Sequence, residues 1–533
     1  MSSCFFYPIK NEVIGFFRNF AFIIIHTTMG IIARQSIKGT IATYIGVAIG
    51  FVTTFFILTK YLTPEEVGLS RVLVDAATLF SSLALLGTQS STLRFYPHFK
   101  DGSQNQQGLY FWTLIIPFVG FLLFLICFFA FKGWIINTFQ ENSPLFVNYV
   151  YFTLPIAFFM LYMAVFEVNA TILERVAIPR MIREVFIRAS LLIGYLLYGL
   201  WHLIDLDGLV IVFCATYGLG ALLNLGYLLF SQKISFKPNF SNITPELRRD
   251  FLLYTSFLIM TALVGSVMPT LSSFFITAKM GLMFTGIYAI ANYVATLVEI
   301  PSRSLNPIVQ PRIAVALRAT PPDLPTATSL YKQVSLNQLL ASMSILILIW
   351  INIDLIFEIL PNGEQYAAGK WVVLILAISK LISSSFGIGS SALAYTRWYY
   401  TSLFFTLILM VLSIVLNNYL IPICGIEGGA WATLASNAIY FFLLLLYIKW
   451  RVGTHPFSKR QLLVLAVGLL MLGLNYLIVW ITGEIVPEPS LIFSITAAVV
   501  RTSIVAVAGL LMVYYGNVSP DVVGLIKKVL RKA

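Results

Sequence analysis

Residues 109–131 read LYFWTLIIPFVGFLLFLICFFAF, a run without a charged side chain that ends at Lys132. A transmembrane helix needs about 20 predominantly apolar residues, so this run alone is long enough to span a bilayer. The rest of the 533-residue chain is similar, because 59% of it is hydrophobic and only 11% is charged. A soluble domain carries about 25% charged residues, and a disordered one combines low hydrophobicity with high charge. The composition therefore predicts an all-α polytopic membrane protein.

Apolar runs bounded by charged residues, proline and glycine predict about fourteen transmembrane helices. Their expected cores are 39–59, 69–91, 109–131, 146–168, 183–201, 208–230, 250–274, 282–302, 333–357, 368–390, 398–418, 427–448, 461–482 and 490–514. The longest connection runs roughly from Arg303 to Tyr331. This length excludes a separate soluble catalytic domain, so any chemistry must occur within the membrane or in short loops.

Membrane topology explains the net charge of +12, so the charge does not indicate binding to nucleic acid. Placing the N-terminus in the cytoplasm puts most of the 34 basic residues on that side, as expected of cytoplasmic loops. We therefore expect both termini to be cytoplasmic. The cysteines and histidines show no metal-ligand spacing, and no phosphate-binding glycine-lysine loop occurs. The sequence thus predicts no metal, no cofactor and no ATP-driven transport within this chain.

Residues 1–28 precede a second plausible start at Met29. Their apolar stretch is short and interrupted by Arg18 and Asn19, and no small-residue cleavage site follows. We interpret residues 1–28 as an N-terminal extension, with an interfacial amphipathic segment as the alternative.

An internal repeat connects the two halves of the chain. Gly68 and Gly286 are 218 residues apart, and the same offset relates Ala77-Thr78-Leu79 to Ala295-Thr296-Leu297 and Arg94 to Arg312. Transporters are often built from such repeats. We expect two six-helix lobes, 29–232 and 233–450, followed by helices 13 and 14 and a basic tail in 451–533.

Polar residues recur at helical spacing within the second and eighth predicted helices. The second carries Arg71, Asp75, Thr78 and Ser82, and the eighth carries Tyr288, Asn292, Thr296, Glu299 and Arg303. A charge at a helix centre costs roughly 2.5–3.5 kcal/mol on insertion scales, so these stripes are expected to face a polar lumen. Snorkelling to the interface is the alternative for Arg71 and Arg303. The predicted lumen residues are Arg71, Asp75, Thr78, Arg94, Asn292, Glu299, Arg303, Arg312 and Lys380.

Two further charged groups have structural interpretations. Arg180, Glu184 and Arg188 form a helical series that Glu167 could join, giving either a functional cluster or a neutralised helix end. Arg501 lies within the last predicted helix, where it could anchor the appended helix pair or meet a carboxylate.

Several motifs resemble those of a known family. Leu62-Thr63-Pro64-Glu65-Glu66-Val67-Gly68, followed by Leu86-Gly87 and Arg94-Phe95, resembles the signature after the first helix of polysaccharide-unit and O-antigen flippases. These belong to the multidrug/oligosaccharidyl-lipid/polysaccharide exporter superfamily. Gly286-Ile287-Tyr288-Ala289-Ile290-Ala291 and Pro311-Arg312-Ile313 are similar to its second-half pattern. Ser272 and Ser273 stand where many relatives carry an aspartate, which puts ion coupling through that carboxylate in doubt.

The resemblance implies a transporter, not an enzyme. It would flip undecaprenyl-pyrophosphate-linked oligosaccharide across the bacterial inner membrane for lipopolysaccharide or polysaccharide biosynthesis, by alternating access of two lobes. Its partners would be the lipid-linked oligosaccharide, membrane lipids and a polysaccharide polymerase. Arg71, Arg94, Arg303, Arg312 and Lys380 are the cations available to replace water around the pyrophosphate.

Other functions stay open. Asp75, Glu167 and Glu299 would suit a drug or organic-cation antiporter of the same superfamily. A membrane glycan polymerase, ligase or glycosyltransferase would need a large loop or an acidic catalytic cluster, and a scaffold would not need paired polar stripes. The glycan itself, whether O-antigen, capsule or exopolysaccharide, is not specified by the sequence.

Overall fold

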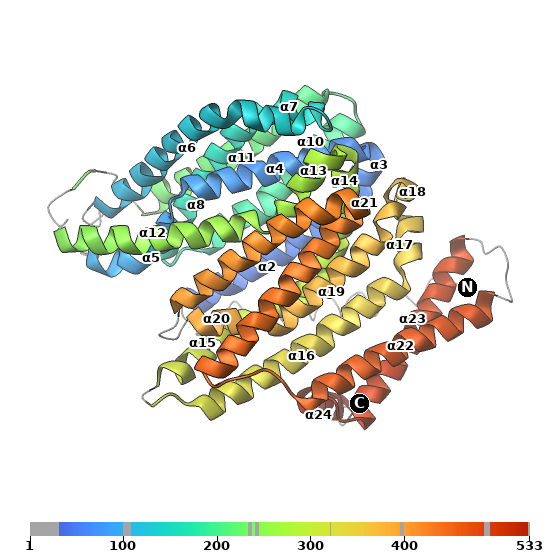
Figure 1. Cartoon of the computed structure of the whole chain (residues 1–533). Coiled ribbons are helices and arrows are strands. Elements are labelled where there is room, and N and C mark those ends of the chain that lie inside the picture. The colour runs from blue at the N-terminus through green and yellow to red at the C-terminus, as the bar shows by residue number, and fades with distance from the viewer. Residues whose placement is uncertain are drawn as a thin grey trace, which may run out of the picture. The chain divides into compact units, whose positions relative to one another are not determined.

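The computed structural model describes residues 31–99, 108–232, 237–239, 245–319, 321–394, 399–483 and 491–530. The N-terminal extension predicted at residues 1–28 lies outside these ranges. Helices make up nearly all of the described chain, which contains no β-strand (Figure 1). Eleven helices in the described ranges are long and apolar enough to cross a membrane. The all-α polytopic fold class is confirmed, whereas the count of fourteen is not.

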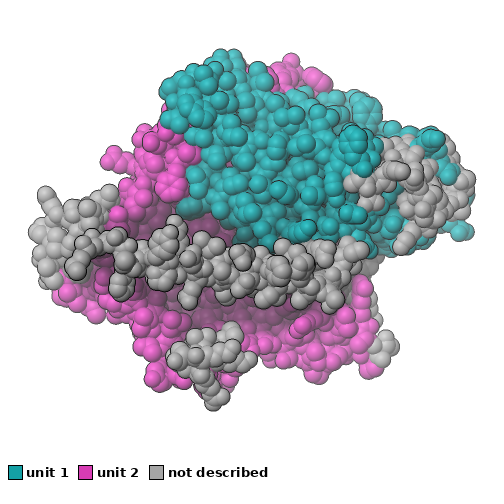
Figure 2. All heavy atoms as spheres, turned by 180° about the vertical axis from the view of Figure 1, so that it is seen from behind, with its two compact units in different colours: residues 1–53, 80–126, 154–258 teal, residues 54–79, 127–153, 259–533 magenta. Residues whose placement is uncertain are grey.

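The chain divides into two compact units, coloured separately in Figure 2. Unit 1 comprises residues 1–53, 80–126 and 154–258, and unit 2 comprises residues 54–79, 127–153 and 259–533. The helices of the N-terminal half are α2 (Ile31–Val52), η1 (Thr53–Leu58), α3 (Thr59–Tyr61), α4 (Pro64–Ala84), α5 (Thr88–Phe99), α6 (Leu109–Phe139), α7 (Pro144–Tyr149), η3 (Val150–Phe152), α8 (Thr153–Ile172), α9 (Ala177–Met181), η4 (Ile182–Phe186), α10 (Ile187–Gly199), α11 (Leu206–Gln232) and α12 (Pro245–Val267). Those of the C-terminal half are α13 (Leu271–Met280), α14 (Leu282–Thr296), η5 (Leu297–Glu299), α15 (Ile300–Arg318), α16 (Leu324–Ile351), α17 (Ile353–Ile359), α18 (Gly363–Tyr366), η6 (Ala367–Gly369), α19 (Lys370–Phe386), α20 (Ile388–Ala394), α21 (Tyr399–Arg451), α22 (Lys459–Gly483), α23 (Leu491–Tyr515) and α24 (Pro520–Leu530).

The eleven candidate spans differ from the fourteen predicted ones in three places. The span expected at 183–201 is divided between η4 and α10, and the span expected at 250–274 is divided between α12 and α13. Pro269 lies in the second break, where its missing N–H and its ring oppose a continuous helix. The spans expected at 398–418 and 427–448 are both part of α21, which has a non-helical backbone at Gly425 (φ 60°, ψ −139°).

The span predicted at 69–91 is also interrupted. Leu86 and Gly87 have φ values of 47° and 67°, so the backbone turns through the left-handed region between α4 and α5. Glycine adopts this region without a steric penalty, and the Leu-Gly pair therefore marks a helix end rather than a helix interior.

Within unit 2, α4 and α14 cross at their N-terminal ends through two glycines. A Cβ atom on Gly68 would overlap the carbonyl oxygen of Leu282, and one on Gly286 would overlap the carbonyl oxygen of Pro64. The two contacts are equivalent under the 218-residue offset. Gly68 corresponds to Gly286, and Pro64 corresponds to Leu282. Only residues without a side chain allow two helix backbones to approach this closely.

Candidate functional site

The first part of the candidate site is an ion pair on α4. Nε of Arg71 donates to Oδ2 of Asp75 at 2.9 Å, one helical turn along the same face. The Asp75 side chain is only 6% exposed, whereas that of Arg71 is 40% exposed. The pair therefore buries its carboxylate and leaves its guanidinium within reach of a further anion.

Hydroxyl groups from three other helices of unit 2 surround this pair. The Ser273 side chain of α13 lies near the Asp75 carboxylate. The Tyr288 hydroxyl of α14 lies near Ser272 and Thr433 and is close enough to interact electrostatically with Arg71. Oγ of Ser272 lies 3.1 Å from Oγ1 of Thr433 on α21. We call Arg71, Asp75, Ser272, Ser273, Tyr288 and Thr433 the Arg71 cluster.

A second group of charges, the Glu299 cluster, connects η5, α15 and α19. Oε1 of Glu299 lies 3.4 Å from Nζ of Lys380, and Oε2 lies 3.4 Å from Nη2 of Arg303. One carboxylate thus bridges two cations, and its side chain is 17% exposed against 26% for Lys380 and 63% for Arg303. Since both distances exceed those of a close charge-assisted hydrogen bond, an incoming anion could displace the carboxylate.

Pro301 explains why Glu299 lies in a tightened turn. Proline has no N–H and its ring crowds the carbonyl four residues earlier, here that of Leu297. The chain accordingly passes from α14 into the 3₁₀ turn η5 and then into α15 without a loop. A short 3₁₀ segment within a helix often marks a functional hinge.

The remaining predicted polar residues of these two helices lie between or beside the clusters. Asn292 lies on α14 between Tyr288 and Glu299, and its carbonyl oxygen accepts a 2.7 Å hydrogen bond from Thr296. Thr78 is exposed on α4, and its hydroxyl donates to the carbonyl oxygen of Val74. These hydroxyls satisfy part of their hydrogen-bonding capacity within their own helices.

The structure does not bring Arg94 and Arg312 into either cluster. Arg94 belongs to unit 1, where its guanidinium lies 3.8 Å from the ring centroid of Tyr254 in a cation–π contact. Arg312 is exposed on α15, more than two helical turns beyond Arg303. Of the nine predicted residues, Arg71 and Asp75 contact each other, and Arg303 and Lys380 both contact Glu299.

The two clusters together contain three cations and two carboxylates, so their net charge is positive. Three cavities of unit 2, with volumes of about 390, 630 and 510 Å³, are lined by none of the nine predicted residues. Within the described chain, no group of three or more His, Cys, Asp and Glu side chains could hold a metal ion. The arrangement is suited to exchanging an internal carboxylate for an external anion.

Two other predicted charge groups hold helices together. In unit 1, Glu167 pairs with Arg183, while Arg188 pairs with Glu184 at 2.8 Å and donates to the carbonyl oxygen of Gly46 at 2.7 Å. The partner of Glu167 is thus Arg183, which is not a member of the predicted series Arg180, Glu184 and Arg188.

In unit 2, Nη2 of Arg501 donates to the carbonyl oxygen of Ile351 at 2.6 Å, which anchors α23 to the end of α16. This contact supports the anchoring role considered for Arg501 from the sequence.

Sequence reasoning did not place Ser272, Ser273 and Thr433 in the site. Serine and threonine are common in transmembrane helices, so single hydroxyls carry little signal. The signal in the sequence is the pair Ser272 and Ser273, which the family resemblance places where many relatives carry an aspartate. In the structure the carboxylate of Asp75 on α4 lies near Ser273.

Comparisons with known proteins identify the family and the fold. The family model described as "Polysaccharide biosynthesis protein" matches residues 32–316. An uncharacterized membrane protein of Methanocaldococcus jannaschii is 28% identical over 229 residues, which are 42% of this chain and 52% of that protein. The chain therefore spans about half the length of this curated relative.

Solved structures show the same fold at low sequence identity. The lipid II flippase MurJ in an inward closed conformation aligns with a TM-score of 0.67 at 15% identity, covering 88% of this chain and 98% of that one. An inward-facing multidrug resistance MATE family transporter of the MOP superfamily aligns with a TM-score of 0.57 at 16% identity, covering 77% and 94%. A Vibrio cholerae MATE transporter aligns with a TM-score of 0.54 at 13% identity, covering 79% and 98%.

Proposed function

Because the chain belongs to the polysaccharide biosynthesis protein family, we propose that it flips lipid-linked oligosaccharides across a membrane. The family and the fold support a multi-pass membrane transporter or flippase. The finer assignment is an undecaprenyl-pyrophosphate-linked repeat unit destined for lipopolysaccharide, O-antigen or another surface polysaccharide. The membrane would be the bacterial inner membrane, with both termini in the cytoplasm and a polysaccharide polymerase as a downstream partner.

One observation carries this proposal: Glu299 bridges Lys380 and Arg303, and all three residues belong to the candidate membrane spans Leu282–Asn306 and Gly363–Ser390. A pyrophosphate brings at least two negative charges, and only fixed cations can replace its water inside a bilayer. Oxygens of the pyrophosphate can occupy the place of the Glu299 carboxylate between the two cations. Arg71, with its half-exposed guanidinium, supplies a third cation on α4.

Alternating access in this proposal uses the two lobes 29–232 and 233–450, with 451–533 appended. The reciprocal contact of Gly68 and Gly286 supports this division, because it connects positions that the repeat makes equivalent. Because the helices cross closely at one end, this crossing can serve as the pivot about which the two lobes rotate, as in transporters with internal repeats. The glycan would follow the polar stripe of α4 and α14, and the polyprenyl chain would stay in the lipid.

An organic-cation antiporter is the second candidate, favoured by the likeness to MATE transporters and by the buried carboxylates Asp75 and Glu299. Each of these carboxylates already has a cationic partner. An organic cation would therefore compete with fixed arginine or lysine side chains, whereas an anion competes only with a carboxylate. This difference favours the anionic cargo.

The test is an export assay in a strain that lacks the chromosomal gene. Deletion should accumulate lipid-linked repeat units on the cytoplasmic side, and the wild-type chain should restore surface glycan. Lys380→Ala and Arg71→Ala should insert normally but fail to restore export, whereas Lys132→Ala, an exposed position outside both clusters, should restore it. Normal export by both cluster variants would refute the assigned site, and drug efflux without glycan export would favour the antiporter.

A further inference from the structure

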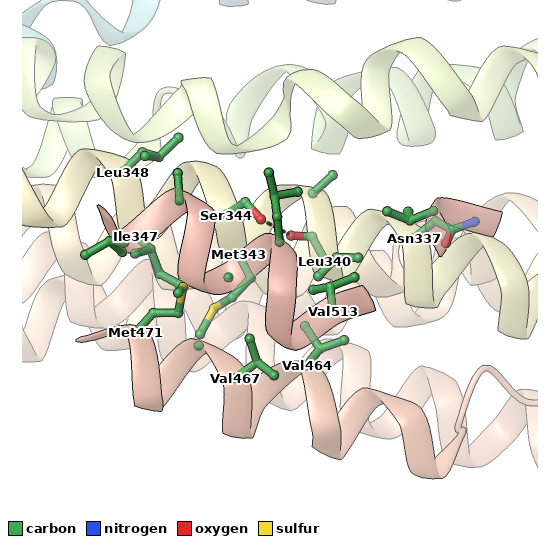
Figure 3. A pocket seen from close by; sticks show the side chains of 17 residues that line it. Asn337, Leu340, Met343, Ser344, Ile347, Leu348, Val464, Val467, Met471 and Val513 are labelled. Carbon is green, nitrogen blue, oxygen red and sulfur yellow. Dashed lines mark hydrogen bonds between the residues drawn. The ribbon is translucent and has the colours of Figure 1, made fainter. Parts of the chain in front are cut away.

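A long apolar cavity in unit 2 runs beside α16. It has a volume of about 390 Å³ and is lined by α16, α22, α23 and Val522 of α24 (Figure 3). The lining residues of α16 extend from Asn337 to Leu348, about 16 Å along a helix with a rise of 1.5 Å per residue. We call this cavity the α16 slot. A volume of this size spread over that length suits a single flexible chain better than a compact ring system.

The walls of the slot can recognise only hydrocarbon. Its lining is aliphatic, methionine or glycine except for Asn337 and Ser344. Asn337 donates to Asp521 and accepts from Ser519, both at 2.7 Å. The Ser344 hydroxyl donates to the carbonyl oxygen of Leu340 at 2.9 Å. A ligand would therefore gain its affinity from buried apolar area rather than from hydrogen bonds.

Two methionines make the walls adaptable. The side chain of Met343 fills the space that a Cβ atom would need at Gly468, and that of Met471 does the same at Gly509. Methionine is unbranched and polarisable, and it adjusts to irregular partners. The walls can thus move aside for an alkyl chain whose length or unsaturation varies.

Three basic residues follow or precede lining residues of the slot by four or five positions on their helices. Lys332 lies five residues before Asn337 on α16, Arg460 lies four residues before Val464 on α22, and Lys527 follows Val522 on α24. A cavity of about 510 Å³ at the start of α16 is lined by Lys332, Ser329 and Gly453.

The electrostatic environment at this end is positive. Burial, together with the nearby charges of Lys332 and Lys449, lowers the pKa of His455 below its usual value. Asp521, an acidic group beside the slot, is already engaged by Gln333 and Asn337. An anionic head group would therefore be attracted to this end of the slot.

We propose that the α16 slot binds one acyl chain of an anionic phospholipid, with the lipid phosphate at the basic end formed by Lys332, Arg460 and Lys527. The bound lipid would fill the space between α16 and the pair α22–α23, which lie side by side (Figure 1). This binding is independent of the cargo carried by the rest of the protein. Basic clusters beside membrane helices are a general means of retaining anionic lipids.

Photocrosslinking of the full-length protein tests this proposal. The probe is phosphatidylglycerol with a diazirine on one acyl chain, presented in phosphatidylcholine vesicles that contain the purified chain. Peptides of α16 and α22 that line the slot should be labelled, and a phosphatidylcholine probe with the same diazirine chain should label them much less. Ala341→Phe and Ala506→Phe, two separate changes that fill the slot, should each reduce labelling about tenfold or more, because losing burial of only two methylenes has that effect.

Ala466→Phe is the matched control, since Ala466 is exposed on α22 and does not line the slot. Labelling of this variant should equal that of the wild type, and size-exclusion profiles of all variants should show whether they fold. Three results would overturn the proposal: equal labelling by both head groups, labelling spread evenly over the membrane helices, or labelling of the slot only by a polyprenyl phosphate probe. If one filling variant fails to fold, the other decides.

Discussion

Asn142 and Asn362 make reciprocal hydrogen bonds between the two halves of the proposed repeat, both within unit 2. Nδ2 of Asn142 donates to the carbonyl oxygen of Ala278 on α13 at 2.9 Å, and Nδ2 of Asn362 donates to the carbonyl oxygen of Thr59 on α3 at 2.9 Å. Each asparagine thus binds a helix that belongs to the other half of the proposed repeat. Together with the crossing of Gly68 and Gly286, these bonds hold the proposed outer ends of the helices together.

Removing one of these asparagine hydrogen bonds should open this end of the helices to a measurable extent. Ser143→Cys, in a chain without its native cysteines, places a reporter thiol where the buried Ser143 hydroxyl now donates to Thr277. Asn362→Ala should raise the rate at which a water-soluble maleimide labels this thiol several-fold, because it removes the equivalent bond on the other side. Asn352→Ala, which instead removes a hydrogen bond to Thr502 of α23 from the residue after α16, should leave the rate unchanged. Equal rates in all three proteins would show that the asparagines do not restrain the end.

The glycine crossing predicts an unusual response to alanine. In a helix interior, Gly→Ala normally stabilises by about 0.5–1 kcal/mol. Gly68→Ala and Gly286→Ala should instead destabilise by about 1–3 kcal/mol, because the new methyl group overlaps backbone atoms of the crossing helix. Thermal unfolding in detergent measures the difference. Gly473→Ala on α22, where nothing lies within 4 Å of a new Cβ, should be neutral or stabilising, and the same stabilisation at Gly68 would contradict the crossing.

Substitutions in the Glu299 cluster should affect the stability of the protein and its transport activity differently. Lys380→Met leaves the Glu299 carboxylate with Arg303 alone, the more exposed of its two partners, and should cost about 1–3 kcal/mol of stability. The double variant Lys380→Met/Glu299→Gln removes both members of the pair and should recover most of that stability, while transport stays lost. Unfolding and export are measured on the same preparations. Restored export in the double variant would mean that Lys380 has only a structural role.

The contact between Arg94 and Tyr254 predicts a graded effect within unit 1. Tyr254→Phe retains an aromatic face for the guanidinium and should change thermal stability little. Tyr254→Leu retains bulk but not the aromatic face and should lower stability by about 0.5–1 kcal/mol. In an Arg94→Leu background the two Tyr254 variants should become equivalent. A persistent difference in that background would assign the effect to packing rather than to the cation.

The sequence predicted the fold class well because lipid exposure imposes apolar runs of a fixed length. It was less successful where a span is not one straight helix. Pro269, Gly425 and the Leu86-Gly87 pair all interrupt or bend helices, and only the tertiary packing shows which of these breaks remain within a span. The charges at the start of α10 shorten its apolar stretch, which explains why 183–201 does not count as a single long span.

Helical spacing was informative for charged pairs and uninformative for hydroxyls. The spacing of Arg71 and Asp75 predicted their shared face, and that of Glu299 and Arg303 did the same. The pairing of Lys380 with Glu299 connects α19 to η5, and no periodicity within one helix encodes such a contact. Arg94 and Arg312 occupy equivalent repeat positions in the sequence, yet the structure puts Arg94 against an aromatic ring and leaves Arg312 exposed.

The most direct measurement is flipping in vesicles that contain only the purified protein. Two fluorescent lipids are compared, one with the glycan attached through pyrophosphate and one with the same glycan on an uncharged polyprenol. The wild type should move the pyrophosphate lipid between leaflets and leave the neutral one in place, and Lys380→Ala should move neither. Equal flipping of both lipids, or undiminished flipping of the pyrophosphate lipid by Lys380→Ala, would contradict a cation-lined path for an anionic head group.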